Sequence, residues 1–360
     1  MPRAIAQKAP PARLRVDSES YEAVVDNPFL SVASDPRSTF SIDVDTASYA
    51  LVRRFLDSGS LPPPDAVRIE ELINYFAYRY PQPSGDAPVS IVTSLARAPW
   101  NPAHYLARVA LQARHVEAGA RPAANLVFLI DVSGSMESEN KLGLVKYGLR
   151  QLVSTLRDQD RVSIVTYAGN SGLALAPTSG ERRDTILKAI DQLEAGGSTN
   201  GGAGIGLAYS LARQNFARGK VNRVLLATDG DFNVGVTSQG ELVELIQREA
   251  KSGVFLSVLG FGDGNYKDST LEQLADKGNG NYAYIDERAE AQKVLLEQAT
   301  ATLVRVAKDV KLQLEFNPTE VAAFRLIGYE NRQLQHRDFN DDSKDAGELG
   351  AGGGVTACTS

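Results

Sequence analysis

Short apolar runs alternate with amphipathic segments through the middle of the chain. The apolar runs contain few polar positions, as expected of strands that are buried on both faces. They lie at 125–133, 161–168, 222–230, 254–262 and 281–286. Between them, several segments place their apolar residues on one face of a helix. These segments are 142–156, 182–193, 205–216, 240–251 and 271–278. The alternation predicts one α/β domain over residues 124–300, a Rossmann-like, doubly wound, mostly parallel sheet with helices on both faces.

The pattern is different in the residues before this domain. Residues 1–33 are rich in Ala, Pro and charge without a clear period, which predicts a flexible lead-in. Residues 34–85 predict a small helical region, and residues 86–123 a β-rich segment with an antiparallel pair of strands. In the helical region we expect Asp65 to cap a helix with a one-faced apolar stripe. That stripe is Ile69, Leu72, Ile73 and Phe76.

The residues after the α/β domain begin with a helical pattern at about 287–307 and continue as a β-rich C-terminal region, 301–360. The chain ends in GGGVTACTS, and we expect region 301–360 to be truncated there. The glycine-rich tail from Gly347 predicts a frayed end.

Composition narrows the classes of function. The net charge of −6 argues against a nucleic-acid partner, which would require a basic patch. A single cysteine, Cys358, excludes an internal disulfide and a Cys-based zinc site, and the three histidines are scattered. No run approaches the ~18 apolar residues of a membrane span, so we expect no direct membrane insertion. The first thirty residues lack the apolar core of a signal peptide, which predicts either a chain that is not exported or a targeting segment that has been removed.

Side chains that carry oxygen gather where the predicted strands end. Asp131, Ser133 and Ser135 follow the first strand of the α/β domain at every second position. Thr199 lies in the loop GGSTNGG, and Asp229 ends the strand LLATDG. Because ligands of open α/β sheets bind at the carboxyl ends of the strands, we expect these five side chains to converge. Any one of them alone would more often cap a helix or stabilise a turn.

Two carboxylates and three hydroxyls, without nitrogen or sulfur, are typical ligands of a hard cation. The sequence therefore predicts a metal site for Mg²⁺, with Mn²⁺ or Ca²⁺ as alternatives. Neutral hydroxyls leave the metal much of its positive charge, which favours an anionic additional ligand. We expect that ligand to be an Asp or Glu presented by a partner protein, and we expect binding rather than catalysis.

The combination of DVSGSMES, GGSTN and ATDG resembles the metal-ion-dependent adhesion site (MIDAS) of von Willebrand factor type A domains, which act in cell adhesion. The resemblance assigns the family's Asp-x-Ser-x-Ser motif to Asp131, Ser133 and Ser135, its threonine to Thr199, and its later aspartate to Asp229. It implies that Ser133, Ser135 and Thr199 bind the metal directly while the aspartates act partly through water. It also implies that affinity can be switched by displacement of the last helix.

The flanking segments resemble the bacterial YfbK-like family. The stretches STFSIDVDTASYALVRRFL and PPPDAVRIEELINYF, and the residues from VKLQLEFNP to DAGELGAG, carry this likeness. Members place a helical region before the type A domain and a β-rich region after it. The resemblance implies a location in the bacterial cell envelope or periplasm, and the missing export signal leaves a cytoplasmic location as the alternative.

Two other functions are compatible with the sequence. A Mg²⁺-dependent phosphohydrolase would use Asp43 and Asp45, which lie in a loop similar to that of haloacid-dehalogenase-like phosphatases, or the predicted metal site itself. Ala47 stands where that loop requires Thr or Val, so a structural turn is the better interpretation. An intracellular adaptor for an AAA-type ATPase is the second alternative. The stretches GGSTNGGAGIG and GFGDGN lack the spacing of phosphate-binding loops, and no nucleophile with a histidine partner is apparent.

Overall fold

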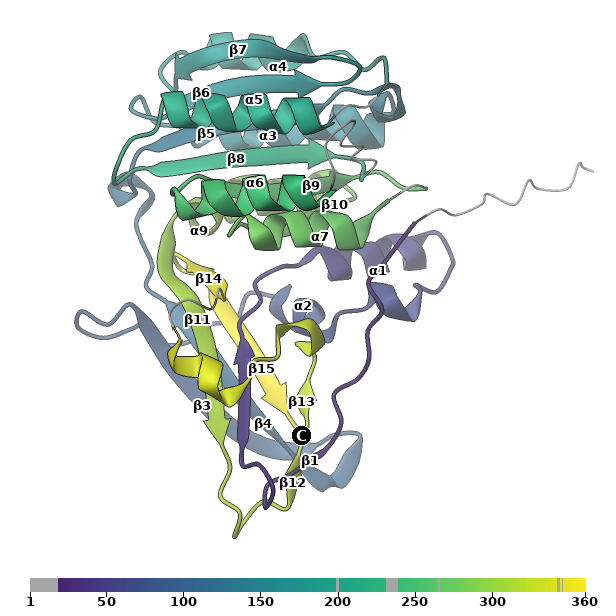
Figure 1. The fold of residues 1–360 in the computed structure, drawn as a ribbon, viewed down its shortest axis with the longest axis vertical. Helices are drawn as coiled ribbons and strands as arrows, with labels where there is room; N and C mark the ends of the chain where they lie inside the picture. The colour runs from purple at the N-terminus through teal and green to yellow at the C-terminus, as the bar shows by residue number, and fades with distance from the viewer. Residues whose placement is uncertain (1–18, 199–200, 231–238, 265, 342–343, 345) are drawn as a thin grey trace, which may run out of the picture.

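A computed structural model of the protein describes residues 19–198, 201–230, 239–264, 266–341, 344 and 346–360. Figure 1 shows an α/β domain built on one large sheet and, below it, a β-rich unit to which both ends of the chain contribute. We call these the A domain and the flanking domain.

The A domain is built on a six-stranded sheet with the order β10-β9-β8-β5-β6-β7. Its strands are β5 (Ala124–Asp131), β6 (Arg161–Tyr167), β7 (Ser171–Ser179), β8 (Val221–Thr228), β9 (Phe255–Phe261) and β10 (Tyr282–Ile285). Neighbouring strands are parallel except for β6 and β7, which are antiparallel. Every residue of the central strand β5 is buried, as its unbroken apolar run predicts.

Helices cover both faces of this sheet (Figure 1). They are α3 (Leu144–Ser154), α4 (Arg183–Asp191), α5 (Gly201–Gln214), α6 (Gln239–Lys251), α7 (Asp268–Lys277), α8 (Arg288–Gln292) and α9 (Ala299–Leu303). Successive side chains of a strand point to opposite faces. On β5, Leu126 and Phe128 accordingly pack in the core cluster that includes α3 and α4, whereas Val127 and Leu129 pack in the cluster that includes α5 and α6. The predicted α/β class and doubly wound sheet are confirmed.

Two local predictions in the A domain differ from the structure. The edge strand β7 was not predicted, because its residues are mostly only partly buried and lack an apolar run. The helix predicted over 287–307 is broken by a π-helical turn at Lys293–Glu297 and ends at Leu303. Strand β11 begins at Arg305, where the alternating sequence Arg-Val-Ala-Lys pairs with β14.

The flanking domain joins residues from both sides of the A domain in the sequence. One of its sheets has the order β14-β11-β2 and another the order β13-β15-β4-β3, with a two-stranded pair β1-β12. The strands before the A domain are β1 (Leu30–Ser31), β2 (Arg37–Ser41), β3 (Val89–Ala98) and β4 (Asn101–Ala113). Those after it are β11 (Arg305–Glu315), β12 (Ala323–Phe324), β13 (Leu326–Ile327), β14 (Gly347–Gly350) and β15 (Gly354–Thr359). The predicted antiparallel pair is β3 with β4.

The prediction of a frayed tail from Gly347 was wrong. Strand β15 lies between β13 and β4, and its Val355 and Ala357 are buried in the core of the flanking domain. Residues 19–33, predicted as part of a flexible lead-in, instead pack on the protein. Asn27 is buried and donates hydrogen bonds to the carbonyls of Leu326 and Gly328 at 3.1 and 2.8 Å.

The helical segment before the A domain forms α1 (Ala47–Asp57) and the short α2 (Ile69–Asn74). The predicted apolar stripe of the second helix is not its buried face. Ile69 and Phe76 are exposed, whereas Glu70 and Glu71 are 1% and 0% exposed. Asp65 lies in a separate 3-10 turn, and no side chain caps α2. The helix therefore buries its acidic face, which has arginine and backbone partners in the tertiary structure.

Candidate metal site

Asp131 is the last residue of strand β5, so its side chain lies at the carboxyl-terminal edge of the sheet. It is 0% exposed. Its Oδ1 accepts hydrogen bonds from the backbone N–H of Ser133 at 2.9 Å and from the Ser133 hydroxyl at 2.6 Å. Its Oδ2 accepts from the hydroxyls of Thr228 and Tyr167, both at 3.1 Å. Each carboxylate oxygen thus accepts two hydrogen bonds, which fills the acceptor capacity of the group.

These hydrogen bonds indicate that Asp131 positions the side chains of Ser133, Tyr167 and Thr228. Burial raises the pKa of Asp131 and the charge of Asp229 raises it further, while the hydrogen bonds from Ser133 and Tyr167 act in the opposite direction. The donors come from three strands or their ends: Ser133 after β5, Tyr167 at the end of β6 and Thr228 at the end of β8. Asp131 therefore fixes the relative positions of the loops at this edge.

The two serine hydroxyls are arranged so that oxygen lone pairs remain available. A hydroxyl has one hydrogen to donate, and Ser133 donates its hydrogen to Asp131. The Ser135 hydroxyl lies 3.1 Å from the Ser133 hydroxyl and must therefore be the donor in that contact. Ser133 is 2% exposed whereas Ser135 is exposed, so the pair leads from the buried carboxylate towards solvent.

Asp229 follows β8 at the same edge and is 5% exposed. The ammonium nitrogen of Lys141 lies 2.9 Å from its Oδ2. Lys141 belongs to the π-helical turn Glu139–Gly143 that precedes α3. Its side chain packs directly against Gly262: a Cβ atom added to Gly262 would lie 2.3 Å from the Lys141 Cε. A positively charged group is thus held against the acidic residue of the predicted site.

The loop that carries Thr199 approaches the first loop of the site. The backbone N–H of Gly134 donates to the carbonyl of Gly197 at 3.0 Å, and the N–H of Gly196 donates to the carbonyl of Val132 at 2.7 Å. Thr199 itself lies outside the described residues. The structure therefore brings Asp131, Ser133, Ser135 and Asp229 to one edge of the sheet and leaves the fifth predicted ligand as a prediction.

Sequence reasoning missed three polar side chains of this edge: Lys141, Tyr167 and Thr228. Tyr167 and Thr228 are the last residues of their strands, so a search for polar residues at strand ends would have found them. Lys141 has no such signal, because it reaches Asp229 from the first turn of a helix.

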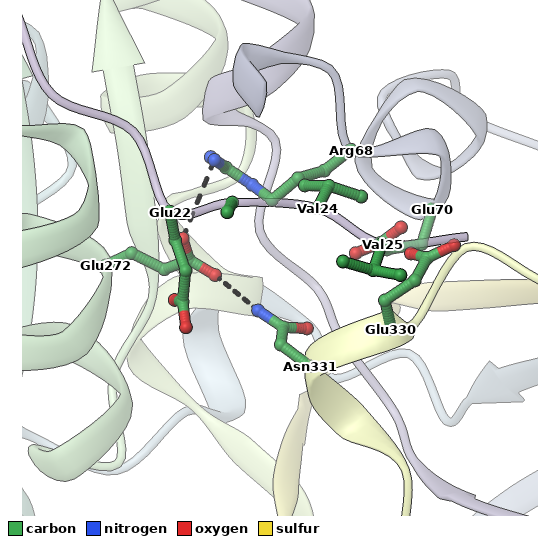
Figure 2. Close-up of a pocket in the computed structure, with 9 residues that line it drawn as sticks. Glu22, Val24, Val25, Arg68, Glu70, Glu272, Glu330 and Asn331 are labelled. Atoms are coloured by element: carbon green, nitrogen blue, oxygen red, sulfur yellow. Dashed lines mark hydrogen bonds and ion pairs between the residues drawn. The ribbon is translucent and has the colours of Figure 1, made fainter. Parts of the chain in front are cut away.

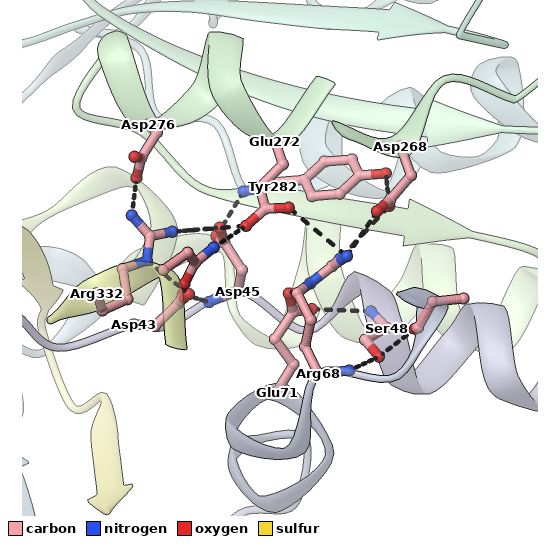
Figure 3. Close-up of polar contacts among 12 residues, drawn as sticks. Asp43, Asp45, Ser48, Arg68, Glu71, Asp268, Glu272, Asp276, Tyr282 and Arg332 are labelled. Atoms are coloured by element: carbon pink, nitrogen blue, oxygen red, sulfur yellow. Dashed lines mark hydrogen bonds and ion pairs between the residues drawn. The ribbon is translucent and has the colours of Figure 1, made fainter. Parts of the chain in front are cut away.

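Asp43 and Asp45, the pair considered for phosphatase chemistry, are held in a polar network where the two domains meet (Figure 3). Asp45 accepts the backbone N–H of Tyr282 at 2.8 Å, and Asp43 accepts the Arg332 guanidinium at 3.0 Å. Both carboxylates are at least 95% buried. They have the surroundings of structural residues, as the sequence interpretation preferred.

Comparison with known families assigns the parts of the chain. Residues 125–299 match the family model described as von Willebrand factor type A domain, residues 15–108 one described as von Willebrand factor, and residues 301–359 one described as "Uncharacterized protein YfbK, C-terminal". Residues 125–299 are thus similar to von Willebrand factor type A domains.

Individual relatives agree with these matches. The chain is 50% identical over 343 residues to YfbK of Escherichia coli K12, covering 93% of this chain and 60% of that protein. It is 29% identical over 187 residues to sll0103 of Synechocystis, covering 51% of this chain and 43% of that one. The chain therefore spans about 60% or less of the length of these relatives. A solved von Willebrand factor type A structure from Catenulispora acidiphila is 17% identical, with a TM-score of 0.49 over 71% of this chain and 60% of that one. The match to YfbK of Escherichia coli and the YfbK C-terminal family model support the relationship to YfbK-like proteins.

Across the described residues, none of the helices has the length and apolar character that a bilayer span requires.

Proposed function

We propose that the A domain is a metal-dependent protein-binding module. Asp131, Ser133, Ser135, Thr199 and Asp229 hold a Mg²⁺ ion, with Mn²⁺ or Ca²⁺ as alternatives, and the carboxylate of an Asp or Glu on a partner protein completes its ligand shell. The observation that carries the proposal is the grouping of Asp131, Ser133, Ser135 and Asp229 at the carboxyl edge of one sheet.

The donor chemistry fits this group of hard cations. The Asp131 carboxylate is occupied by four hydrogen bonds, so its contribution is to orient Ser133 and to supply negative charge. The Ser133 hydroxyl directs its hydrogen to Asp131 and accepts one from Ser135, and so keeps a lone pair for a cation. Ser135 is exposed, and a cation held there is accessible to a carboxylate on another protein.

The same geometry favours binding over catalysis. In the described part of the chain, the hydroxyls of Ser133 and Ser135 contact Asp131 and each other, and no histidine imidazole is among their hydrogen-bond partners. A serine nucleophile requires a base within hydrogen-bond reach. We therefore propose that the domain is not an enzyme.

The first experiment is a calorimetric titration of the protein with MgCl₂. We expect one Mg²⁺ to bind per chain, and we expect Ser133→Ala to weaken binding at least about tenfold, a change of about 1.4 kcal/mol. Ser154→Ala is the matched control, because Ser154 is exposed and donates only to the carbonyl of Gln151. Absence of Mg²⁺ binding to the folded protein would contradict the proposal.

The second experiment asks for the partner and its compartment. Immobilised protein is incubated with envelope and cytosolic fractions of a bacterial extract in Mg²⁺, and bound proteins are eluted with EDTA. The relationship to YfbK-like proteins leads us to propose an envelope partner. A protein retained by the native chain and absent from the Ser133→Ala eluate would satisfy the expectation; equal retention by both would argue against metal-dependent capture.

A further inference from the structure

A second group of acidic side chains lies where the flanking domain packs on the A domain (Figure 3). Asp43 and Asp45 come from the segment after β2, Glu71 from α2, and Asp268 and Glu272 from α7. We call these five residues the junction cluster. Their exposed fractions lie between 0% and 5%, so water does little to screen their charges.

The junction cluster carries more negative charge than its partners neutralise. In the described part of the chain, its ion pairs are made by two guanidinium groups, Arg68 and Arg332. Five carboxylates against two guanidinium groups leave an excess of three negative charges if all are ionised. Burying uncompensated charge is costly, so the excess requires either bound protons or a bound cation.

Three of the carboxylates are placed to bind one ion. Oxygen atoms of Asp43, Glu71 and Glu272 all lie within 4.8 Å of one another. Some point therefore lies no more than about 2.8 Å from all three oxygens, so one ion can contact them with little movement of the side chains. Calcium accepts carboxylate oxygens in flexible, irregular arrangements, whereas magnesium demands near-ideal octahedral geometry.

An unused acceptor supports a ligand at this place. Glu272 is 4% exposed, and its Oε2 accepts no hydrogen bond from the described residues. The nearest cation is Nη1 of Arg68 at 3.6 Å, which already pairs with Asp268 at 2.6 Å. The other oxygen, Oε1, accepts from the Asn331 amide at 2.9 Å. A buried carboxylate oxygen without a donor is uncommon and indicates an additional ligand.

A cavity of about 220 Å³ gives access to Glu272 from solvent (Figure 2). Four glutamates line it: Glu22, Glu70, Glu272 and Glu330. Glu70 is 1% exposed, and its Oε2 also has no hydrogen-bond partner among the described residues. The approach to the junction cluster is therefore acidic, and of the residues that the structure describes Arg68 is the only basic one that lines it.

We propose that a divalent cation, calcium in preference to magnesium, binds between the carboxylates of Asp43, Glu71 and Glu272 and holds the A domain against the flanking domain. The ion reduces the excess of negative charge and provides a cationic partner for Glu272 Oε2. This site is separate from the one under "Proposed function".

The test measures thermal unfolding in EDTA and in CaCl₂, using the Ser133→Ala protein so that the MIDAS does not contribute. Saturating calcium raises the unfolding midpoint by about 5 °C or more, whereas the same concentration of Mg²⁺ raises it less. No calcium-dependent rise would overturn the proposal and would leave bound protons as the means of neutralisation.

The variant Glu272→Gln distinguishes a cation site from a simple salt-bridge network. It removes one negative charge while keeping an oxygen for Asn331. If calcium binds here, the variant in EDTA unfolds at or above the midpoint of its parent and no longer responds to calcium. If the Glu272 carboxylate only forms ion pairs with Arg68 and Arg332, the variant unfolds at a lower temperature in both buffers, and the proposal fails. Glu249→Gln is the control, because Glu249 is 2% exposed and paired with Arg213, and this variant keeps the calcium response.

Crystals grown with CaCl₂ or soaked in MnCl₂ provide a readout that does not depend on stability. We expect anomalous density between Asp43, Glu71 and Glu272. Density only at the MIDAS, with the junction cluster occupied by neither ion, would overturn the proposal.

Discussion

Lys141 and Asp229 form an ion pair with 2.9 Å between Nζ and Oδ2, in a place where the side chains are 13% and 5% exposed. Lys141 comes from the turn before α3 and Asp229 from the end of β8, so the pair links two loops of the predicted metal site. A divalent cation that uses Asp229 must share this carboxylate with the ammonium group or replace it.

We therefore predict that Lys141→Met binds Mg²⁺ more tightly than the native protein. Removing a competing positive charge near a largely buried carboxylate should increase affinity about tenfold, equivalent to about 1.4 kcal/mol. Calorimetric titration measures the change. Lys146→Met on the following helix α3 is the control, since Lys146 contacts the carbonyl of Asp191 and not the site. An affinity equal to or below that of the native protein would show that Lys141 does not compete.

Substitution of Asp131 should affect both metal binding and stability. In Asp131→Ala, the buried hydroxyls of Tyr167 and Thr228 lose an acceptor, which costs about 1–3 kcal/mol per unsatisfied group. We expect the variant to fold, to unfold at a lower urea concentration and to bind no Mg²⁺. Ser133→Ala should also lose Mg²⁺ binding at a smaller cost in stability, because among the described residues the Ser133 hydroxyl contacts only Asp131 and Ser135. Equal stability of the two variants would argue against the positioning role of Asp131.

Arg68 should be essential for the contact between the domains. It is 4% exposed, hydrogen-bonds Glu71 and Asp268, and lies near Glu272. Arg68→Met leaves these carboxylates without their main counter-charge, and breaking a buried pair from one side costs about 3–5 kcal/mol. Urea unfolding measures the loss.

Arg150→Met is the matched control for Arg68→Met. Arg150 pairs with Asp191 at an exposed site, with side-chain exposed fractions of 44% and 47%. Such pairs contribute about 0–1 kcal/mol, so this variant should unfold almost as the native protein does. Similar losses in the two arginine variants would mean that burial of the junction cluster is not what makes Arg68 important.

The C-terminal strand should be necessary for the flanking domain. Val355 on β15 is 1% exposed, and a charge at that position would be buried without a partner. We predict that Val355→Asp exposes the flanking domain to limited proteolysis and leaves a resistant fragment containing the A domain. Val25→Asp is the control, because Val25 is 78% exposed. Unchanged resistance of Val355→Asp would show that β15 is dispensable.

The A domain was largely predictable because its elements are defined by local patterns. The eight residues of β5 are all buried, and helices such as α3 carry a single apolar face, so the period of the sequence gives the type of element. The site followed from the same reasoning, because Asp131 and Asp229 stand at strand ends where parallel sheets bind ligands.

The flanking domain was less predictable because its partners are distant in the sequence. Gly354 pairs with Gln112, and β15 is a short strand that directly follows a glycine-rich stretch, which locally favours a loop. Likewise, Glu70 and Glu71 become the buried face of α2 only because Arg68, Ser48 and residues near Tyr329 supply partners. No local pattern indicates that an acidic face will be buried. The position of β15 and the buried face of α2 are therefore determined by tertiary contacts and not by the local sequence.

The pairing of β4 with β15 has a consequence for biosynthesis. Val109 lies opposite Ala357, so β4 is synthesised early and its partner strand β15 only at the end of the described chain. The A domain between them is contiguous in sequence and can fold as it emerges from the ribosome. Until translation reaches β15, one edge of β4 has unpaired backbone groups that invite association with other chains. Nascent chains stalled after the A domain should therefore depend on chaperones more than the finished protein does.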